Sequence, residues 1–197
     1  SHDIRTPINA VMGFTDLLYK NEKRQESRQY LLKIKNAGEG LLNLINDILD
    51  FSKIEAGQLD IYPETFELQD LIRNIESIFN IQFKEKGVDF KTQVLTDLPD
   101  LVHNDKWRLN QVLTNLLSNA LKFTDAGEVI LSIRYRVQLD RLIFDVKDSG
   151  IGISPENINQ IFDPFIQLDH GSHMVPTGAG LGLAICRKLV DLMGGSI

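Results

Sequence analysis

The chain has 197 residues, 43% of them hydrophobic, so it can form a large domain, or a domain with an appendage, around a substantial core. Its net charge of −6 argues against a nucleic-acid partner, and it has no long basic or apolar run that would contact a membrane. The single cysteine, Cys186, cannot form an internal disulfide, so we expect a cytoplasmic location for this part of the protein. Both ends interrupt a predicted element, so we also expect a longer parent protein with further C-terminal strands. The sequence leaves open whether that parent is anchored in a membrane.

Residues 3–20 are predicted to form an amphipathic helix. Its apolar face has helical spacing and contains Ile4, Ile8, Val11 and Leu18. His2 lies about opposite that face, beside Asp3 and Thr6. An adjacent carboxylate raises imidazole basicity, and a hydroxyl can position water or an oxyanion, so these three residues are a candidate catalytic group. The alternative is an ordinary surface histidine.

A second helix is predicted at residues 28–56, before Gly57. Its apolar arc is wider than one neighbouring helix would bury and contains Leu31, Ile34, Ala37, Leu41, Leu42, Ile45, Ile48 and Leu49. An antiparallel hairpin paired with a second copy, giving a dimeric four-helix bundle, would cover this arc. The alternative is that the second helix packs against the domain that follows.

The rest of the chain alternates strands and helices. Strands are predicted at residues 59–66, 88–95, 129–137 and 142–148, with a short extended segment at 101–103. Helices are predicted at residues 69–86, 105–123, 154–161 and 183–193. Gly87 is expected to end the first of these helices, and Ser154 followed by Pro155 to begin the third.

The central helix, residues 105–123, has a core side and a polar side. The core side carries Leu113, Leu116, Leu117 and Ala120. The polar side carries Arg108, Gln111, Asn115, Asn119 and Lys122. Neutral amide oxygens beside cationic donors suit a magnesium-bound polyphosphate. An ordinary solvated helix face is the alternative for this helix taken alone.

Two further motifs follow the central helix. In the strand 142–148, Asp148 shares the parity of the core residues, where a carboxylate needs a hydrogen-bond donor such as the exocyclic amine of adenine. The alternative is an Asp that begins the turn continued by Gly150 and Gly152. Gly178, Gly180 and Gly182 precede a helix, where backbone N–H groups can cradle phosphate, but a glycine-rich loop alone is a weak signal.

Five segments in order resemble the conserved boxes of sensor histidine kinases of two-component signalling. SHDIRTP resembles the phospho-acceptor box, NLLSNALKFT the asparagine box, DSGIGI the first glycine box, FDPF the phenylalanine box and GAGLGLAI the second glycine box. HDIRTP together with FSKIEAG is similar to the hybrid kinases. The resemblance implies an α+β chain, with a dimerising, phospho-accepting hairpin at 1–57 and an ATP-binding α/β sandwich at 58–197. In that sandwich a mixed sheet is covered by helices.

The resemblance also implies roles for single residues. His2 would accept the phosphoryl group, with Asp3 as base or orienter and Thr6 beside them. Asn119 would bind Mg²⁺ with help from Asn115. Other positions would contact ATP, with Asp148 on the adenine amine and the phenylalanines tethering a lid: Arg108, Lys122, Asp148, Gly150, Gly152, Phe162, Phe165, Gly178, Gly180, Leu181, Gly182 and Leu183.

The implied function is an ATP-dependent protein-histidine kinase that passes its phosphoryl group to an aspartate of a response-regulator receiver domain. Two departures bear on the lid: Ala179 stands where the family commonly has a hydroxyl residue, and residues 170–176 are unlike the usual lid. One alternative is a dimeric nucleotide-binding scaffold or sensing module without transfer. Another is an ATPase or chaperone of the same superfamily, which the Asn at position 115, in place of a water-activating Glu, disfavours.

Overall fold

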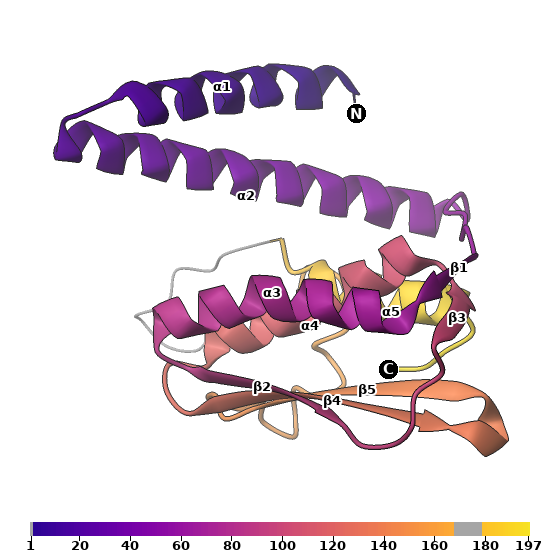
Figure 1. Cartoon of the computed structure of the whole chain (residues 1–197). Helices are drawn as coiled ribbons and strands as arrows, with labels where there is room; N and C mark the ends of the chain where they lie inside the picture. Colours follow the sequence, from indigo (N-terminus) through magenta and orange to yellow (C-terminus); the bar gives the residue numbers. More distant parts are fainter. Residues whose placement is uncertain (1, 168–178) are drawn as a thin grey trace. The chain divides into compact units, whose positions relative to one another are not determined.

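The computed structural model describes residues 2–167 and 179–197. The helices are α1 (His2–Asn21), α2 (Gln25–Glu55), α3 (Leu68–Lys86), α4 (Lys106–Phe123) and α5 (Gly182–Leu192), with a 3-10 turn η1 (Val137–Leu139) (Figure 1). The strands are β1 (Glu64–Glu67), β2 (Asp89–Val94), β3 (Leu101–Asn104), β4 (Glu128–Arg136) and β5 (Arg141–Asp148). Two compact units are present, Ser1–Leu59 with Pro164–Ile185 and Asp60–Asp163 with Cys186–Ile197.

The first unit is built on the antiparallel hairpin of α1 and α2 (Figure 1). The whole of α2 is described, and none of its 31 residues is buried. Apolar side chains on both helices remain about half exposed or more, among them Phe14, Leu17, Leu18, Ile34 and Ile48. The hairpin alone therefore leaves uncovered the wide apolar arc that the sequence predicts.

The second unit contains a mixed sheet, as the family resemblance implied, and its strand order is β2-β4-β5. β2 runs parallel to β4, and β4 runs antiparallel to β5. Helices α3 and α4 cover one face of this sheet (Figure 1). Val129, Leu131 and Ile133 of β4 are completely buried against apolar residues of these helices, because alternate side chains of a strand point to the same face.

A separate antiparallel pair is formed by β1 and β3. The sequence predicts a strand at residues 59–66, but the ladder begins only at Glu64, whose partner is Asn104. The prediction was too early because β3 is itself only four residues long and can pair with only four partners. Pro63, which cannot donate to a ladder, marks the point before pairing starts.

The helix predicted at residues 154–161 is absent; that segment is described and forms successive turns. The Asn157 and Gln160 amides donate to the carbonyls three residues earlier, at Ser154 and Asn157. Ile153 and Ile158 are both about half exposed. A short segment without a buried apolar face lacks the packing that stabilises most helices in proteins, so the N-cap and proline signals were not sufficient.

Helix α4 is anchored at its start by Asp105, which is 5% exposed. One carboxylate oxygen accepts the Arg108 amide at 3.0 Å, which is the N-cap interaction, and the other accepts the Tyr62 amide at 2.9 Å. The side chain therefore joins the segment that leads into β1 to the helix that carries the predicted polar face.

Replacing Asp105 with alanine should lower the free energy of unfolding by about 2 kcal/mol, since a helix cap and a second buried amide both lose their acceptor. Urea denaturation followed by circular dichroism measures this change. Asp97→Ala is the matched control, because Asp97 is an exposed carboxylate in the preceding loop. Equal stabilities of the two variants would show that the Asp105 bonds contribute nothing.

Candidate functional site

The polar face of α4 forms as predicted. Arg108, Gln111, Asn115, Asn119 and Lys122 are all half-buried, and Val112, Leu113, Leu117 and Ala120 on the other side are buried. Leu116, expected in the core, is only half-buried. The Arg108 guanidinium donates to the side-chain amide oxygen of Gln111 at 2.9 Å and lies 4.2 Å from the centroid of the Trp107 ring.

The two asparagines interact directly. The side-chain amide of Asn119 donates to the side-chain oxygen of Asn115 at 3.1 Å. This bond directs the amide nitrogen of Asn119 toward Asn115 and therefore turns its own oxygen away. One turn further along, the Lys122 ammonium lies 4.7 Å from the Phe123 ring centroid. Burial lowers the pKa of Lys122 below its usual value, because partial removal from water disfavours the charged form.

The end of α4 lies against the segment that follows β5. The Phe123 carbonyl accepts the Ile151 amide at 3.3 Å. A Cβ at Gly150 would lie 2.3 Å from the Phe123 carbonyl oxygen, closer than any side-chain carbon can approach. Glycine is therefore required at position 150 for this approach, and the asparagine and first glycine boxes, far apart in sequence, meet here.

Asp148 is the last residue of β5 and pairs with buried Val129 of β4, so its predicted parity is right. Its predicted burial is wrong, since Asp148 is exposed. One carboxylate oxygen accepts the Gly150 amide at 2.9 Å. Asp148 therefore begins the glycine turn, which was the alternative interpretation, and its second oxygen is available to a ligand in the same geometry. Gly152 follows with a positive φ of 71°.

Part of the second glycine box is described. Gly180 has a φ of 69°, and its carbonyl accepts the Phe165 amide at 2.9 Å, which joins the phenylalanine and glycine boxes. Leu181 is 1% exposed, and Gly182 and Leu183 are half-buried in the first turn of α5. Gly178, with residues 170–176 of the predicted lid, lies outside the described residues.

The two phenylalanines have different contacts. Phe162 is half-buried, and the Arg187 guanidinium lies over its ring, 4.1 Å from the ring centroid. Phe165 is 64% exposed, has a φ of 64°, and meets Phe51 of α2 edge to face at 5.8 Å within the first unit. A positive φ is unusual for a residue with a bulky side chain, so the backbone there is held by its surroundings.

The predicted acceptor group lies at the start of α1. Asp3 and Thr6 lie within the helix, as expected, and Thr6 is exposed. The helix begins one residue earlier than predicted, at His2. The side chains of His2 and Asp3 lie outside the described residues.

Two family models match the chain. The His Kinase A (phospho-acceptor) domain matches residues 1–57, and the histidine kinase-, DNA gyrase B-, and HSP90-like ATPase matches residues 104–197. The chain belongs to the sensor histidine kinase family. The first match includes His2, and the second spans the α4 face and both glycine boxes.

Similar proteins place this histidine kinase core among hybrid and sensor kinases. Hybrid signal transduction histidine kinase B of Dictyostelium discoideum is 41% identical over the whole chain, which covers 10% of that relative. Full-length ShkA in complex with AMPPNP is 35% identical, with a TM-score of 0.78 over 98% of this chain and 40% of that one. ThkA in complex with response regulator protein TrrA is 26% identical, with a TM-score of 0.63 over 98% of this chain and 53% of that one. The chain spans between a tenth and a quarter of the length of the curated relatives it matches.

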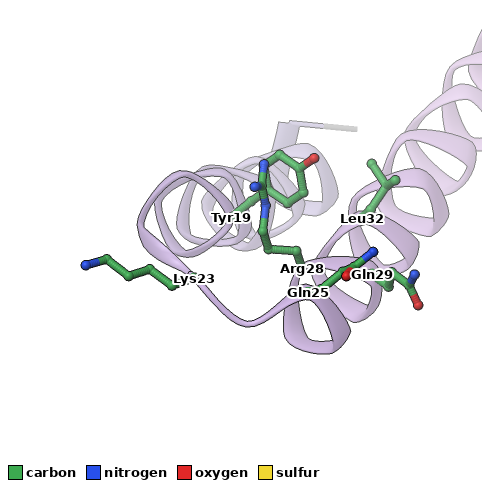
Figure 2. A pocket seen from close by; sticks show the side chains of 6 residues that line it. All are labelled: Tyr19, Lys23, Gln25, Arg28, Gln29 and Leu32. Atoms are coloured by element: carbon green, nitrogen blue, oxygen red, sulfur yellow. The ribbon is translucent and has the colours of Figure 1, made fainter.

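The kinase core also has a concavity at the turn between α1 and α2 (Figure 2). It is lined by Tyr19, Lys23, Gln25, Arg28, Gln29 and Leu32. The Arg28 guanidinium lies 4.7 Å from the Tyr19 ring centroid. None of the residues singled out in the sequence lines this concavity, so it is separate from the candidate site.

Within the described residues, no helix combines the length and hydropathy that crossing a membrane requires.

Sequence reasoning missed three residues that hold segments of the candidate site: Lys86, Asp105 and Arg187. Asp105 carries a readable signal, since Asp at a helix start is a preferred N-cap. Lys86 and Arg187 carry none, because each acts on a segment distant in the chain and resembles any helix-surface cation.

Proposed function

We propose that this chain is the catalytic core of an ATP-dependent protein-histidine kinase, in which the γ-phosphoryl group of ATP passes to a ring nitrogen of His2. The observation that carries the proposal is the junction of α4 with the first glycine box, where the Phe123 carbonyl accepts the Ile151 amide. Through this junction, the loop that follows Asp148 lies against the end of α4, the helix that carries the polar face. Recognition of a nucleotide by both its base and its phosphates requires such an arrangement.

The phosphate end of the site is assigned to α4. The donor set of amide oxygens and cations fits a magnesium polyphosphate. The side-chain nitrogen of Asn119 donates to Asn115, so the side-chain oxygen of Asn119 is left to ligate Mg²⁺. Asn115 would act through this hydrogen bond or through a water bound to the metal. Lys122 and Arg108 would contact phosphate oxygens. Bound Mg²⁺ would neutralise negative charge on the phosphates during transfer.

The base end is assigned to the loop after β5. Asp148, held by the Gly150 amide, would accept the adenine amine with its second oxygen, and Gly152 would allow close approach of the backbone. The second glycine box would then cover the phosphates, through Gly178, Gly180, Leu181, Gly182 and Leu183. Phe162 and Phe165 would tether that cover, and for Phe165 the hydrogen bond from its amide to the Gly180 carbonyl supports the role.

The acceptor end is assigned to the start of α1. A neutral His2 would attack the γ-phosphorus of ATP with the lone pair of one ring nitrogen, while the bond from that phosphorus to the β,γ-bridging oxygen breaks and ADP leaves. Asp3 would orient the ring or take up the proton of the other ring nitrogen. Thr6, exposed on the same helix, would position water or a phosphate oxygen. Transfer then depends on placement of the ring in line with the phosphate, which positioning alone can accelerate strongly.

Two partners are proposed. A second copy of the chain would cover the apolar side chains that α1 and α2 leave exposed, completing a four-helix bundle. A receiver domain of a response regulator would accept the phosphoryl group on an aspartate. The similarity to ThkA, whose solved complex contains the response regulator TrrA, supports this second partner.

The decisive experiment is incubation of the chain with ATP labelled in the γ position, with and without magnesium. We expect label that is stable to alkali and labile to acid, as a phosphoramidate is, only when magnesium is present. Calorimetry with ADP should be run on the same preparation. Nucleotide binding without any protein-bound label would replace the kinase by a nucleotide-sensing scaffold, and absence of binding would contradict the site.

ADP affinity should fall as pH rises in the alkaline range. Burial holds the pKa of Lys122 below its usual value, and a bound phosphate would raise it again, because the anion favours the ammonium form. Binding should therefore take up a proton between these two pKa values, and affinity should decline as pH rises above the lower one. Calorimetry in buffers of different ionisation enthalpy measures the uptake. Lys122→Arg, which stays charged, should remove it; persistent uptake in that variant would exclude Lys122.

A further inference from the structure

The last turn of α4 has no glycine cap. It ends at Thr124, whose backbone is extended, with φ −109° and ψ 108°. The final carbonyls of a helix lack partners within it, and a left-handed residue after the end usually helps to satisfy them. Here the four final carbonyls are satisfied by other groups. The Ala120 carbonyl accepts the Thr124 amide at 3.1 Å, and the Phe123 carbonyl accepts the Ile151 amide.

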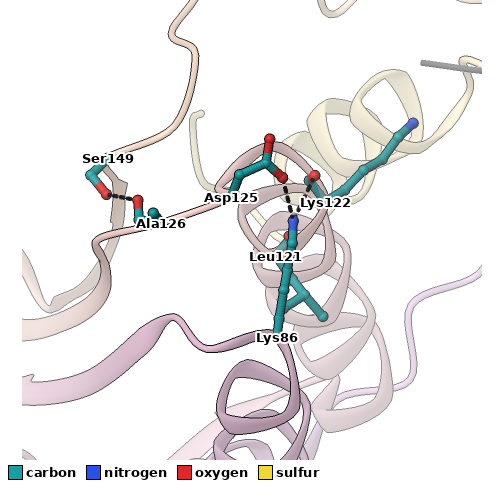
Figure 3. Close-up of polar contacts among 6 residues, drawn as sticks. All are labelled: Lys86, Leu121, Lys122, Asp125, Ala126 and Ser149. Carbon is teal, nitrogen blue, oxygen red and sulfur yellow. Dashed lines mark hydrogen bonds and ion pairs between the residues drawn. The ribbon is translucent and has the colours of Figure 1, made fainter. Parts of the chain in front are cut away.

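The remaining two carbonyls are bound by one side chain from another helix, Lys86, the last residue of α3. Its ammonium donates to the Leu121 carbonyl at 2.7 Å and to the Lys122 carbonyl at 3.2 Å (Figure 3). It also lies 3.1 Å from the Asp125 carboxylate. The Asp125 side chain is 78% exposed, and exposed ion pairs contribute little, so the two carbonyl bonds are the main interaction.

This turn carries residues of both ends of the candidate nucleotide site. Lys122, which belongs to the polar face, directs its side chain away from Lys86 (Figure 3). The next carbonyl, that of Phe123, is the one bound to Ile151 and in close approach to Gly150. If the last turn loosened, the phosphate-contacting lysine and the base-contacting loop would lose their fixed separation.

We propose that Lys86 is a positioning residue that fixes the end of α4 and thereby sets the spacing between the phosphate and adenine subsites. The role rests on the proposed nucleotide site. It does not require Lys86 to touch the nucleotide, since its ammonium is engaged with the backbone of the turn. A cation at a helix C-terminus also stabilises that end through the helix dipole.

The test compares three variants at a temperature where all are folded. Lys86→Met removes the ammonium and keeps an unbranched stem, Lys86→Arg keeps the donor, and Lys84→Met removes an equivalent charge from the same last turn of α3. Calorimetry should show that ADP affinity falls about tenfold in Lys86→Met, equivalent to roughly 1.4 kcal/mol. Affinity should be unchanged in Lys84→Met and largely restored in Lys86→Arg.

A second measurement separates positioning from simple stability. In the nucleotide-free protein, the amide resonances of Gly150 and Ile151 should shift in Lys86→Met and stay unchanged in Lys84→Met. Unchanged resonances and unchanged ADP affinity in folded Lys86→Met would overturn the role, even if its melting temperature fell. Failure of the unsubstituted chain to bind ADP would instead overturn the nucleotide site itself, and this role with it.

Discussion

A chain in which His2 is replaced by glutamine should take up no label from ATP, yet bind ADP as tightly as the unsubstituted chain. The imidazole ring nitrogen offers a lone pair to the phosphorus, whereas the lone pair of an amide nitrogen is delocalised and not nucleophilic. The residues assigned to the nucleotide lie on α4, at the end of β5, in the loop that follows β5 and in the second glycine box. The affinity for ADP should therefore not depend on His2. Protein-bound label and ADP calorimetry measure the two effects separately.

His103→Gln is the matched control, because it makes the same substitution at an exposed histidine of β3. That variant should be labelled as the unsubstituted chain is. Alkali-stable label retained in His2→Gln would mean that another residue accepts the phosphoryl group. Label lost equally from both variants would mean that the effect is not specific to position 2.

Replacing Asp148 with asparagine should weaken ADP binding between about tenfold and a hundredfold, equivalent to about 1.4 to 2.8 kcal/mol. One carboxylate oxygen accepts the Gly150 amide, so in the proposed site the other oxygen would accept the adenine amine. An asparagine has only one oxygen. Whichever donor it accepts, its NH₂ group then faces the other donor. The fold should be unaffected, because Asp148 is exposed.

Asp145→Asn is the control for this experiment. Asp145 lies on the same strand, is exposed, and forms an ion pair with Arg134 at 2.5 Å. It should keep the ADP affinity of the unsubstituted chain while losing the same formal charge. Equal affinity in Asp148→Asn and Asp145→Asn would remove Asp148 from the base site.

Elements that bury a periodic face could be predicted from the sequence. The two sides of α4, the alternation of β4 and the end of α3 at Gly87 all follow from local pattern, and the structure confirms them. The structure of residues 154–161 could not be predicted, since their N-cap and proline signals carry no information about packing. Ile158 remains 49% exposed. The start of β1 depends on the length of its partner β3, and the residues of β1 carry no information about that length.

The candidate site divides in the same way. The polar face of α4 and the parity of Asp148 follow from residue spacing, because both lie within one element. The exposure of Asp148 does not follow from residue spacing, because it depends on which other segments cover the end of the sheet. The meeting of Phe123 with Gly150 and the reach of Lys86 to the end of α4 join segments distant in the chain. Only the tertiary structure brings these groups together.

Helix α2 is described over its whole length and contains no buried residue, so its amides should be weakly protected from hydrogen exchange. Protection of an amide reflects the free energy needed to open its surroundings, which is small where little apolar surface is buried. The α2 amides should therefore exchange quickly in dilute protein and slow as concentration rises, since association supplies the missing burial. The β4 amides, beside the fully buried Val129, Leu131 and Ile133, should exchange slowly at every concentration.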